Sequence, residues 1–379
     1  MLTASLAGGG VFAQDPTAER EALDVQRAHE RRVKQRGEKV YYTQRWNLDD
    51  LPAYEPGQKV SGKVRIWGLN YLTEGLLAKY WEDGFRRYHP EAQLEYFTPT
   101  TLVAVPGLYL GLADLGASRR ITWDELLAFQ RLLGYHPLEI EMATGSFNVP
   151  GWNPALAIFV HKDNPISRLT LTQLDGIFGA ARDGGWNGMA WDSSRARGPE
   201  GNLRTWGQLG LTGEWKDRRI NVHGRPLKHH LQLEIERKVF KGGDKWNEDL
   251  HEYAHDVRPD GSQAITAQEI LVALSQDRYG IAFSDMGYPM PEIKTVALAE
   301  KDGGPYAELT IENVRNRTYP LFTENYFYVN RKPGTSIEAK VKEYLRYVLS
   351  REGQDAVQRD GKYLPLTAVV LRQQRSKLE

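Results

Sequence analysis

The 379-residue chain contains no cysteine. Disulfide frameworks, iron–sulfur clusters, thiolate zinc sites and cysteine nucleophiles are therefore excluded. An excess of charge of one sign is also absent, since Lys plus Arg and Asp plus Glu both number 49. A nucleic-acid-binding protein needs a basic surplus to neutralise phosphates, so we expect no nucleic-acid partner. No run of about 18 apolar residues occurs, so the sequence predicts no membrane-spanning helix.

What the chain does contain is the composition of a globular protein. Hydrophobic residues make up 41% of it, and its aromatic residues are 10 Trp, 19 Tyr and 11 Phe. Disordered chains are poor in such residues. At 379 residues the chain is also long enough for two domains, each with its own core.

Residues 1–61 show patterns typical of an export signal and of a linker to the folded part of the chain. Residues 1–13 are mostly small or apolar and end in Val11-Phe12-Ala13, a small-x-small pattern that a signal peptidase cleaves, although a basic start is missing. We interpret them as a truncated signal segment and expect an exported, periplasmic protein. Residues 14–61 are interpreted as a charged leader, Ala18–Lys39, followed by a Pro- and Gly-containing linker, Leu51–Gly62.

From residue 62 onwards, apolar and amphipathic segments alternate. Short apolar runs predict strands, and apolar residues at helical spacing predict amphipathic helices. The predicted strands are 64–68, 93–97, 155–161 and 326–330. The predicted helices are 72–88, 123–133, 231–240 and 341–349. Alternation of this kind indicates an α/β fold with parallel sheets covered by helices.

One segment fits a zinc-protease motif. His251-Glu252-Tyr253-Ala254-His255 matches H-E-x-x-H, which on a helix places two imidazoles on one face to hold Zn²⁺ while the Glu activates water. Pro259 would end such a helix four residues later, and a polar surface segment is the favoured interpretation. A zinc metallopeptidase remains an alternative function. No serine-nucleophile elbow and no phosphate loop occur, so we predict no catalytic residue, no cofactor and no bound metal.

Polar residues gather where predicted strands end. In open α/β sheets, ligands bind beyond the carboxyl ends of strands, where helix N-termini present free N–H groups. Arginine is well suited to an oxyanion there, because its planar fork donates two parallel hydrogen bonds. Three loops of this kind supply the candidate ligand-binding residues Gly68, Asn70, Tyr71, Ser118, Arg119, Arg225, Lys228, His229 and His230.

Several motifs, in a fixed order from about Val64 to Leu366, resemble the phosphate-type family of periplasmic substrate-binding proteins, the soluble receptors of phosphate ABC importers. Gly111–Arg119 (GLADLGASR) is similar to the family's G-x-A-D-I-G-x-x-S-R turn. Ala155–Phe178 resembles its apolar strand, N-P turn and L-T-x-x-Q-L-x-x-I-F helix. Tyr279–Phe283 resembles the G-I-G-Y strand, and Gly361–Leu366 resembles the closing pattern.

The resemblance implies a two-lobed type II periplasmic binding protein fold with a hinge of two crossing segments. Lobe 1 is expected over residues 62–153 plus 289–379, and lobe 2 over residues 154–288. The implied function is capture of an inorganic oxyanion, phosphate first, in an interlobe cleft, without catalysis. Sulfate, molybdate or a phosphorylated organic solute are alternatives within this class. The implied partner is an ABC permease in the inner membrane, and we expect a monomer.

Two of the three loops depart from the family pattern. The family's hydroxyl residues after the first strand are replaced by Leu69, Asn70 and Tyr71. The third loop, R-x-x-S-G-T in the family, keeps Arg225 but carries Lys228-His229-His230. The departures leave open a bulkier or more highly charged anion, or a degenerate site used for surface interaction. We expect Arg119 and Arg225 to face each other as unpaired cations from opposite lobes.

Overall fold

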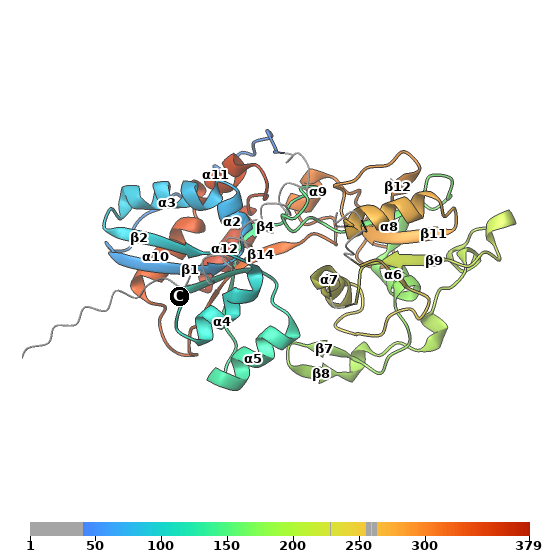
Figure 1. Ribbon diagram of the computed structural model, residues 1–379, viewed down its shortest axis with the longest axis horizontal. Helices are drawn as coiled ribbons and strands as arrows, with labels where there is room; N and C mark the ends of the chain where they lie inside the picture. Colours follow the sequence, from blue (N-terminus) through green and yellow to red (C-terminus); the bar gives the residue numbers. More distant parts are fainter. Residues whose placement is uncertain (1–40, 228, 255–258, 260–263) are drawn as a thin grey trace, which may run out of the picture. The chain divides into compact units, whose positions relative to one another are not determined.

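The computed structural model describes residues 41–379 except residues 228, 255–258 and 260–263 (Figure 1). The expectations for the signal segment and for Ala18–Lys39 lie outside the described residues. None of the helices in the described part of the chain is long and apolar enough to cross a membrane.

The first sheet has five strands in the order β2-β1-β3-β14-β4. Its strands are β1 (Gly62–Gly68), β2 (Ala92–Phe97), β3 (Leu115–Arg119), β4 (Leu138–Thr144) and β14 (Glu324–Val329). The first three run parallel, as predicted, but β14 runs antiparallel to both β3 and β4. The sheet is mixed because β14 re-enters it from the far part of the chain, with Asn325 opposite Arg119.

Helices cover both faces of the first sheet, so its inner strand β14 is buried on both faces. Every residue of β14 is buried. Phe327 packs in one core with Trp81 of α3, whereas Tyr326 and Tyr328 pack in the other core with Phe129 of α5. Successive strand side chains point to opposite faces, so a strand buried on both faces is apolar at nearly every position. The helices around this sheet are α2 (Tyr71–Glu74), α3 (Leu77–Tyr88), α4 (Ala104–Tyr109), α5 (Trp123–Leu133), α10 (Ala339–Val348), α11 (Arg351–Asp360) and α12 (Ala368–Ser376).

The second sheet has its own five strands in the order β10-β9-β11-β5-β12. They are β5 (Ala157–His161), β9 (Asn221–Gly224), β10 (His251–Glu252), β11 (Gly280–Ser284) and β12 (Ile293–Thr295). Strand β9 runs parallel to β10 and β11, and β5 runs antiparallel to β11 and β12. The helices in this part are α6 (Leu171–Phe178), α7 (His230–Lys238), α8 (Thr266–Ser275) and α9 (Ile311–Arg315). Two small sheets, β6 (Arg168–Thr170) with β13 (Ala297–Ala299) and β7 (Gly185–Asn187) with β8 (Ala190–Asp192), complete it.

Side-chain caps fix the starts of α5, which was predicted over 123–133, and of α6, which lies in the family motif Ala155–Phe178. Thr122 and Glu125 form a reciprocal capping box at the start of α5, and Thr170 and Gln173 do the same for α6. Each box satisfies two backbone N–H groups that a helix start otherwise leaves unpaired. Gly134 ends α5 with a left-handed φ of 80°, the backbone conformation in which glycine carries no steric cost.

We call the parts built around the two sheets the first and second lobes, and their boundary differs from the predicted one. Strand β12 pairs with β5, and Leu309, Val314, Tyr319 and Leu321, which precede β14 in the chain, belong to the second core. The return to the first lobe therefore lies at residues 322–323, immediately before β14, and not at residue 289. The first crossing lies between β4 and β5, residues 145–156.

Two further expectations are corrected. The segment expected as a linker is folded onto the first lobe, since Leu51 and Tyr54 are buried in its core. The helix expected over 72–88 is split into α2 and α3 around Gly75. The helix expected at 341–349 is present as α10 and is followed by α11 and α12.

Candidate functional site

The candidate residues of the second loop lie at the end of β3. Ser118 and Arg119 are the last two residues of this strand. The Ser118 side chain is buried, and neither its Oγ nor the buried Nη1 of Arg119 has a hydrogen-bond partner. In the described part of the chain Arg119 also has no carboxylate at ion-pair distance. Buried polar groups are almost always paired, so two adjacent unpaired donors point to a ligand.

Gly68 holds the end of β1 against the end of β3. Its φ is +125°, and a Cβ at this position would lie 2.1 Å from the carbonyl oxygen of Ala117. The next residue, Leu69, donates its backbone N–H to that same carbonyl over 2.8 Å. Only glycine permits this approach, so Gly68 brings the first loop next to Ser118.

The other two candidates of the first loop are engaged locally. Asn70 donates from its side-chain amide to Glu74 within the same turn. Tyr71 packs on Trp152 of the first crossing, with ring centroids 4.6 Å apart. Helix α2 has only four residues, so its N-terminus offers little of the dipole that a longer helix presents to an anion. These contacts give Asn70 and Tyr71 roles in supporting the loop and the crossing.

The third loop lies in the second lobe, where Arg225 follows β9. Its guanidinium Nη2 donates to Oδ2 of Asp285 over 2.9 Å, and both side chains are buried. The expectation that Arg225 is an unpaired cation is therefore wrong. Its Nε remains without a partner, and burial lowers the pKa of Arg225. Arginine stays charged even so, because its pKa starts above 12.

His229 and His230 begin α7. The backbone N–H of Leu231 donates to Nδ1 of His229 over 3.2 Å, so His229 caps the helix in place of a hydroxyl residue. The two imidazole rings lie 4.3 Å apart. Burial above all, and then the positive charges of His229, Arg119 and Arg225, lower the pKa of His230 well below its usual range. His230 is therefore neutral at physiological pH and lies within the field of arginines from both lobes. Lys228 lies outside the described residues.

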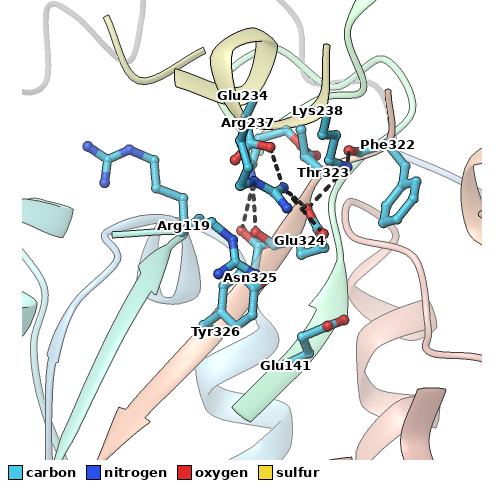
Figure 2. Close-up of polar contacts among 12 residues, drawn as sticks. Arg119, Glu141, Glu234, Arg237, Lys238, Phe322, Thr323, Glu324, Asn325 and Tyr326 are labelled. Carbon is cyan, nitrogen blue, oxygen red and sulfur yellow. Dashed lines mark hydrogen bonds and ion pairs between the residues drawn. The ribbon is translucent and has the colours of Figure 1, made fainter. Parts of the chain in front are cut away.

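The C-terminal half of α7 meets the second crossing in a partly buried ionic cluster (Figure 2). We call Glu234, Arg237, Lys238 and Glu324 the hinge cluster. Arg237 Nη2 lies 2.6 Å from Glu234 and 3.2 Å from Glu324, and Lys238 Nζ lies 3.4 Å from Glu324. Burial alone would raise the pKa of Glu324, but the positive charges around it, led by Lys238 and Arg237, lower it. The side chain of Arg119 points away from this network (Figure 2).

The described residues of the H-E-x-x-H segment do not adopt the helical geometry of a zinc-protease site. His251 and Glu252 form β10, an extended edge strand paired with β9, so they lack the helical spacing that the motif needs. Glu252 accepts a hydrogen bond from the backbone N–H of Leu227 over 2.9 Å. His255 lies outside the described residues. Among the residues that the structure describes, no group of three or more His, Asp or Glu has metal-binding geometry.

Two residues of the site were missed from the sequence. Asp285 directly follows β11, which contains most of the strand expected at Tyr279–Phe283, and its place near a strand end was the signal that would have found it. Asn325 is buried in β14 opposite Arg119, and its Nδ2 has no partner. Asn325 directly precedes the predicted strand 326–330, and no local signal marks it, because its position opposite Arg119 depends on strand pairing.

Comparisons with known proteins agree with this architecture. A family model described as a PBP superfamily domain matches residues 55–352. The phosphate-binding protein PstS of Pseudomonas aeruginosa is 34% identical over 322 residues, which cover 84% of this chain and 88% of that protein. The same figures hold for PstS of a second strain of that species.

Solved structures of related proteins are more distant. PstS from Borrelia burgdorferi aligns with a TM-score of 0.49 and 15% identity, covering 82% of this chain and all of that one. An ABC-type phosphate transport receptor from Vibrio cholerae aligns with a TM-score of 0.47 and 16% identity, covering 79% of this chain and 99% of that one.

Proposed function

Since the chain belongs to the PBP superfamily and to the family of the phosphate-binding protein PstS, we propose that it captures an inorganic oxyanion, phosphate first, between its two lobes. We further propose that it is exported to the periplasm, acts as a monomer without catalysis, and delivers its ligand to an ABC permease in the inner membrane. The name of the 34%-identical relative supports the choice of phosphate.

One observation carries the proposal for the site. Ser118 Oγ and Arg119 Nη1 are buried donors without partners, on consecutive residues at the end of β3. Leaving such groups unpaired costs about 1–3 kcal/mol each. An oxyanion accepts both hydrogen bonds and supplies the negative charge that Arg119 lacks.

The second lobe contributes donors of a different kind. Arg225 is held by Asp285, so this pair adds hydrogen-bond donors but little net charge. Helix α7 has nine residues and begins at His230. The positive charges of Arg119 and Arg225 act on His230, so both arginines lie near the N-terminus of this helix. A helix N-terminus stabilises a nearby anion through its free N–H groups and its dipole. Neutral His230 adds a hydrogen-bonding group without adding charge.

Isothermal titration of the full chain with phosphate, sulfate and zinc separates the possible functions. Saturable one-to-one binding of phosphate supports the proposal, and binding of sulfate alone reassigns the anion. Zinc binding without anion binding favours the metallopeptidase alternative. No heat with any of the three favours a degenerate site used for surface interaction and overturns the proposal.

A further inference from the structure

The exposed surface carries an aromatic contact between the two lobes. Trp123 is the first residue of α5 in the first lobe, and Trp186 lies in β7 of the second lobe. Their ring centroids are 5.7 Å apart with an interplanar angle of 48°. Figure 1 shows the β7–β8 hairpin next to α5. Neither residue belongs to a crossing segment, so a change in the angle between the lobes changes this contact.

The two tryptophans are exposed to a degree that is unusual for such large apolar side chains. Trp123 is 41% exposed and Trp186 is 38% exposed, although they contact each other. Trp191 of β8, 48% exposed, packs edge-on against Trp186 with centroids 5.3 Å apart. A contact that leaves this much surface in water is weak, and weak contacts between lobes are suited to forming and breaking.

On the first-lobe side, Trp123 is rigidly joined to the anion-binding segment. It stands four residues after Arg119. Between them, Ile121 donates its backbone N–H to the Tyr328 hydroxyl over 3.0 Å, and Thr122 caps α5. The short segment between them is therefore fixed, and Trp123 moves together with Arg119 when the lobes move.

On the second-lobe side, Trp186 is joined to the loop that follows α7. Its backbone N–H donates to Gly242 O over 2.8 Å, and Arg195 donates to the carbonyl oxygens of both Trp186 and Lys241 over 2.9 Å. Gly242 is fixed at this place, because its φ is +84° and a Cβ would lie 2.1 Å from Trp186 O. Trp186 is thus tied to the helix whose N-terminus carries His229 and His230.

We propose that Trp123 and Trp186 form an aromatic clasp that positions the Arg119 segment against α7 and holds the closed, anion-bound arrangement of the lobes. This inference rests on the proposed function. The clasp stabilises only the closed state of the lobes. A contact that is present in one state shifts the equilibrium toward that state by its own free energy. Aromatic pairs of this geometry correspond to about a 2- to 10-fold change in an equilibrium constant.

The test compares Trp123→Ala with Trp191→Ala in the full chain. Trp191 has similar exposure but contacts Trp186 within its own hairpin, so it is the matched control. We expect Trp123→Ala to raise the Kd for phosphate about 2- to 10-fold, mainly through faster release, and Trp123→Phe to restore most of the affinity. Trp191→Ala should leave Kd within a factor of about two. Equal Kd values for the two alanine variants would overturn the clasp.

A distance measurement separates this inference from the proposed function. Because the natural chain has no cysteine, Asp124→Cys with Asn187→Cys gives two unique sites for nitroxide labels next to the clasp. We expect phosphate to shorten the label-to-label distance and Trp123→Ala to lengthen it. If the wild type gives no heat with phosphate, the proposed function fails, and the clasp is still tested in the anion-free protein. There, an unchanged distance distribution in Trp123→Ala contradicts it.

Discussion

Asp285 accepts a hydrogen bond from Arg225 over 2.9 Å, and the two residues directly follow the neighbouring parallel strands β11 and β9. The pair places a neutralised arginine at the sheet edge where ligands of α/β proteins bind. Of the two arginines of the candidate site, Arg119 is the one that has no carboxylate partner in the described part of the chain. The positive charge available to an anion therefore comes chiefly from the first lobe.

Asp285→Asn tests this division of charge. Without the carboxylate, Arg225 is a buried cation without compensation, and we expect the anion-free protein to lose about 3 kcal/mol of its free energy of unfolding. Phosphate then becomes the counter-ion of both arginines, so its stabilising effect should be larger than in the wild type. Chemical denaturation with and without phosphate measures both quantities. Exposed Asp183→Asn is the control, and an unchanged phosphate effect in Asp285→Asn would contradict the prediction.

Glu236 gives the chain a predictable pH dependence of stability. Burial raises the pKa of Glu236 to about 7, although it accepts a hydrogen bond from Trp246 over 2.7 Å. Between the unfolded value of 4.5 and about 7, the folded state holds more protons than the unfolded state, so stability falls as pH rises through this range. Glu236→Gln keeps an acceptor for Trp246 but does not titrate.

We therefore expect Glu236→Gln to match the wild type near pH 4.5 and to exceed it by about 2–3 kcal/mol at pH 8. Urea denaturation at the two pH values measures the difference. Exposed Glu200→Gln should show no such trend. A Glu236→Gln variant that is no more stable than the wild type at pH 8 shows that the carboxyl group titrates normally.

Glu324→Gln tests the hinge cluster. The substitution leaves the largely buried Lys238 and the half-buried Arg237 with less negative charge, and we expect a loss of about 3 kcal/mol in the free energy of unfolding. Because the cluster fixes α7 at the second crossing, we also expect weaker phosphate binding. Glu139→Gln, which removes a half-exposed ion pair with Arg120 inside the first lobe, should cost less than about 1 kcal/mol and leave binding unchanged. Equal effects of the two substitutions on phosphate binding would contradict a role for the hinge cluster in binding.

His251→Ala tests the alternative function. His251 belongs to an extended edge strand, so we expect phosphate affinity to stay within a factor of about two. Zinc should bind wild type and variant with the same weak affinity. Tighter zinc binding by the wild type, together with zinc-dependent peptide hydrolysis, would favour the metallopeptidase.

The sequence predicted the fold where local signals and tertiary structure agree. Apolar runs marked β5 and β14, and apolar residues at helical spacing marked α5 with the bounds that the structure has. The antiparallel direction of β14 and the boundary at residues 322–323 were not predicted, because both depend on which sheet a strand joins. That choice is made by packing between distant segments such as β12 and β5.

For the site, the sequence identified the strand ends but not the hydrogen-bond and ion-pair partners of each side chain. The position of Ser118-Arg119 follows from a strand-end pattern, and their unpaired donors lie where that pattern predicts a ligand. The pairing of Arg225 with Asp285 joins residues 60 positions apart, and only the parallel register of β9 and β11 brings them together. Asn70 and Tyr71 matched the loop pattern, but their side chains contact Glu74 and Trp152.

The most direct test of the account is the affinity for phosphate of Arg119→Met, measured by isothermal titration beside the wild type. Arg131→Met, an exposed arginine on α5, is the matched control. Removing a charged donor from a buried ion site costs about 3 kcal/mol, so we predict an affinity loss of roughly 100-fold for Arg119→Met and none for Arg131→Met. Phosphate binding that is as tight in Arg119→Met as in the wild type would contradict the account.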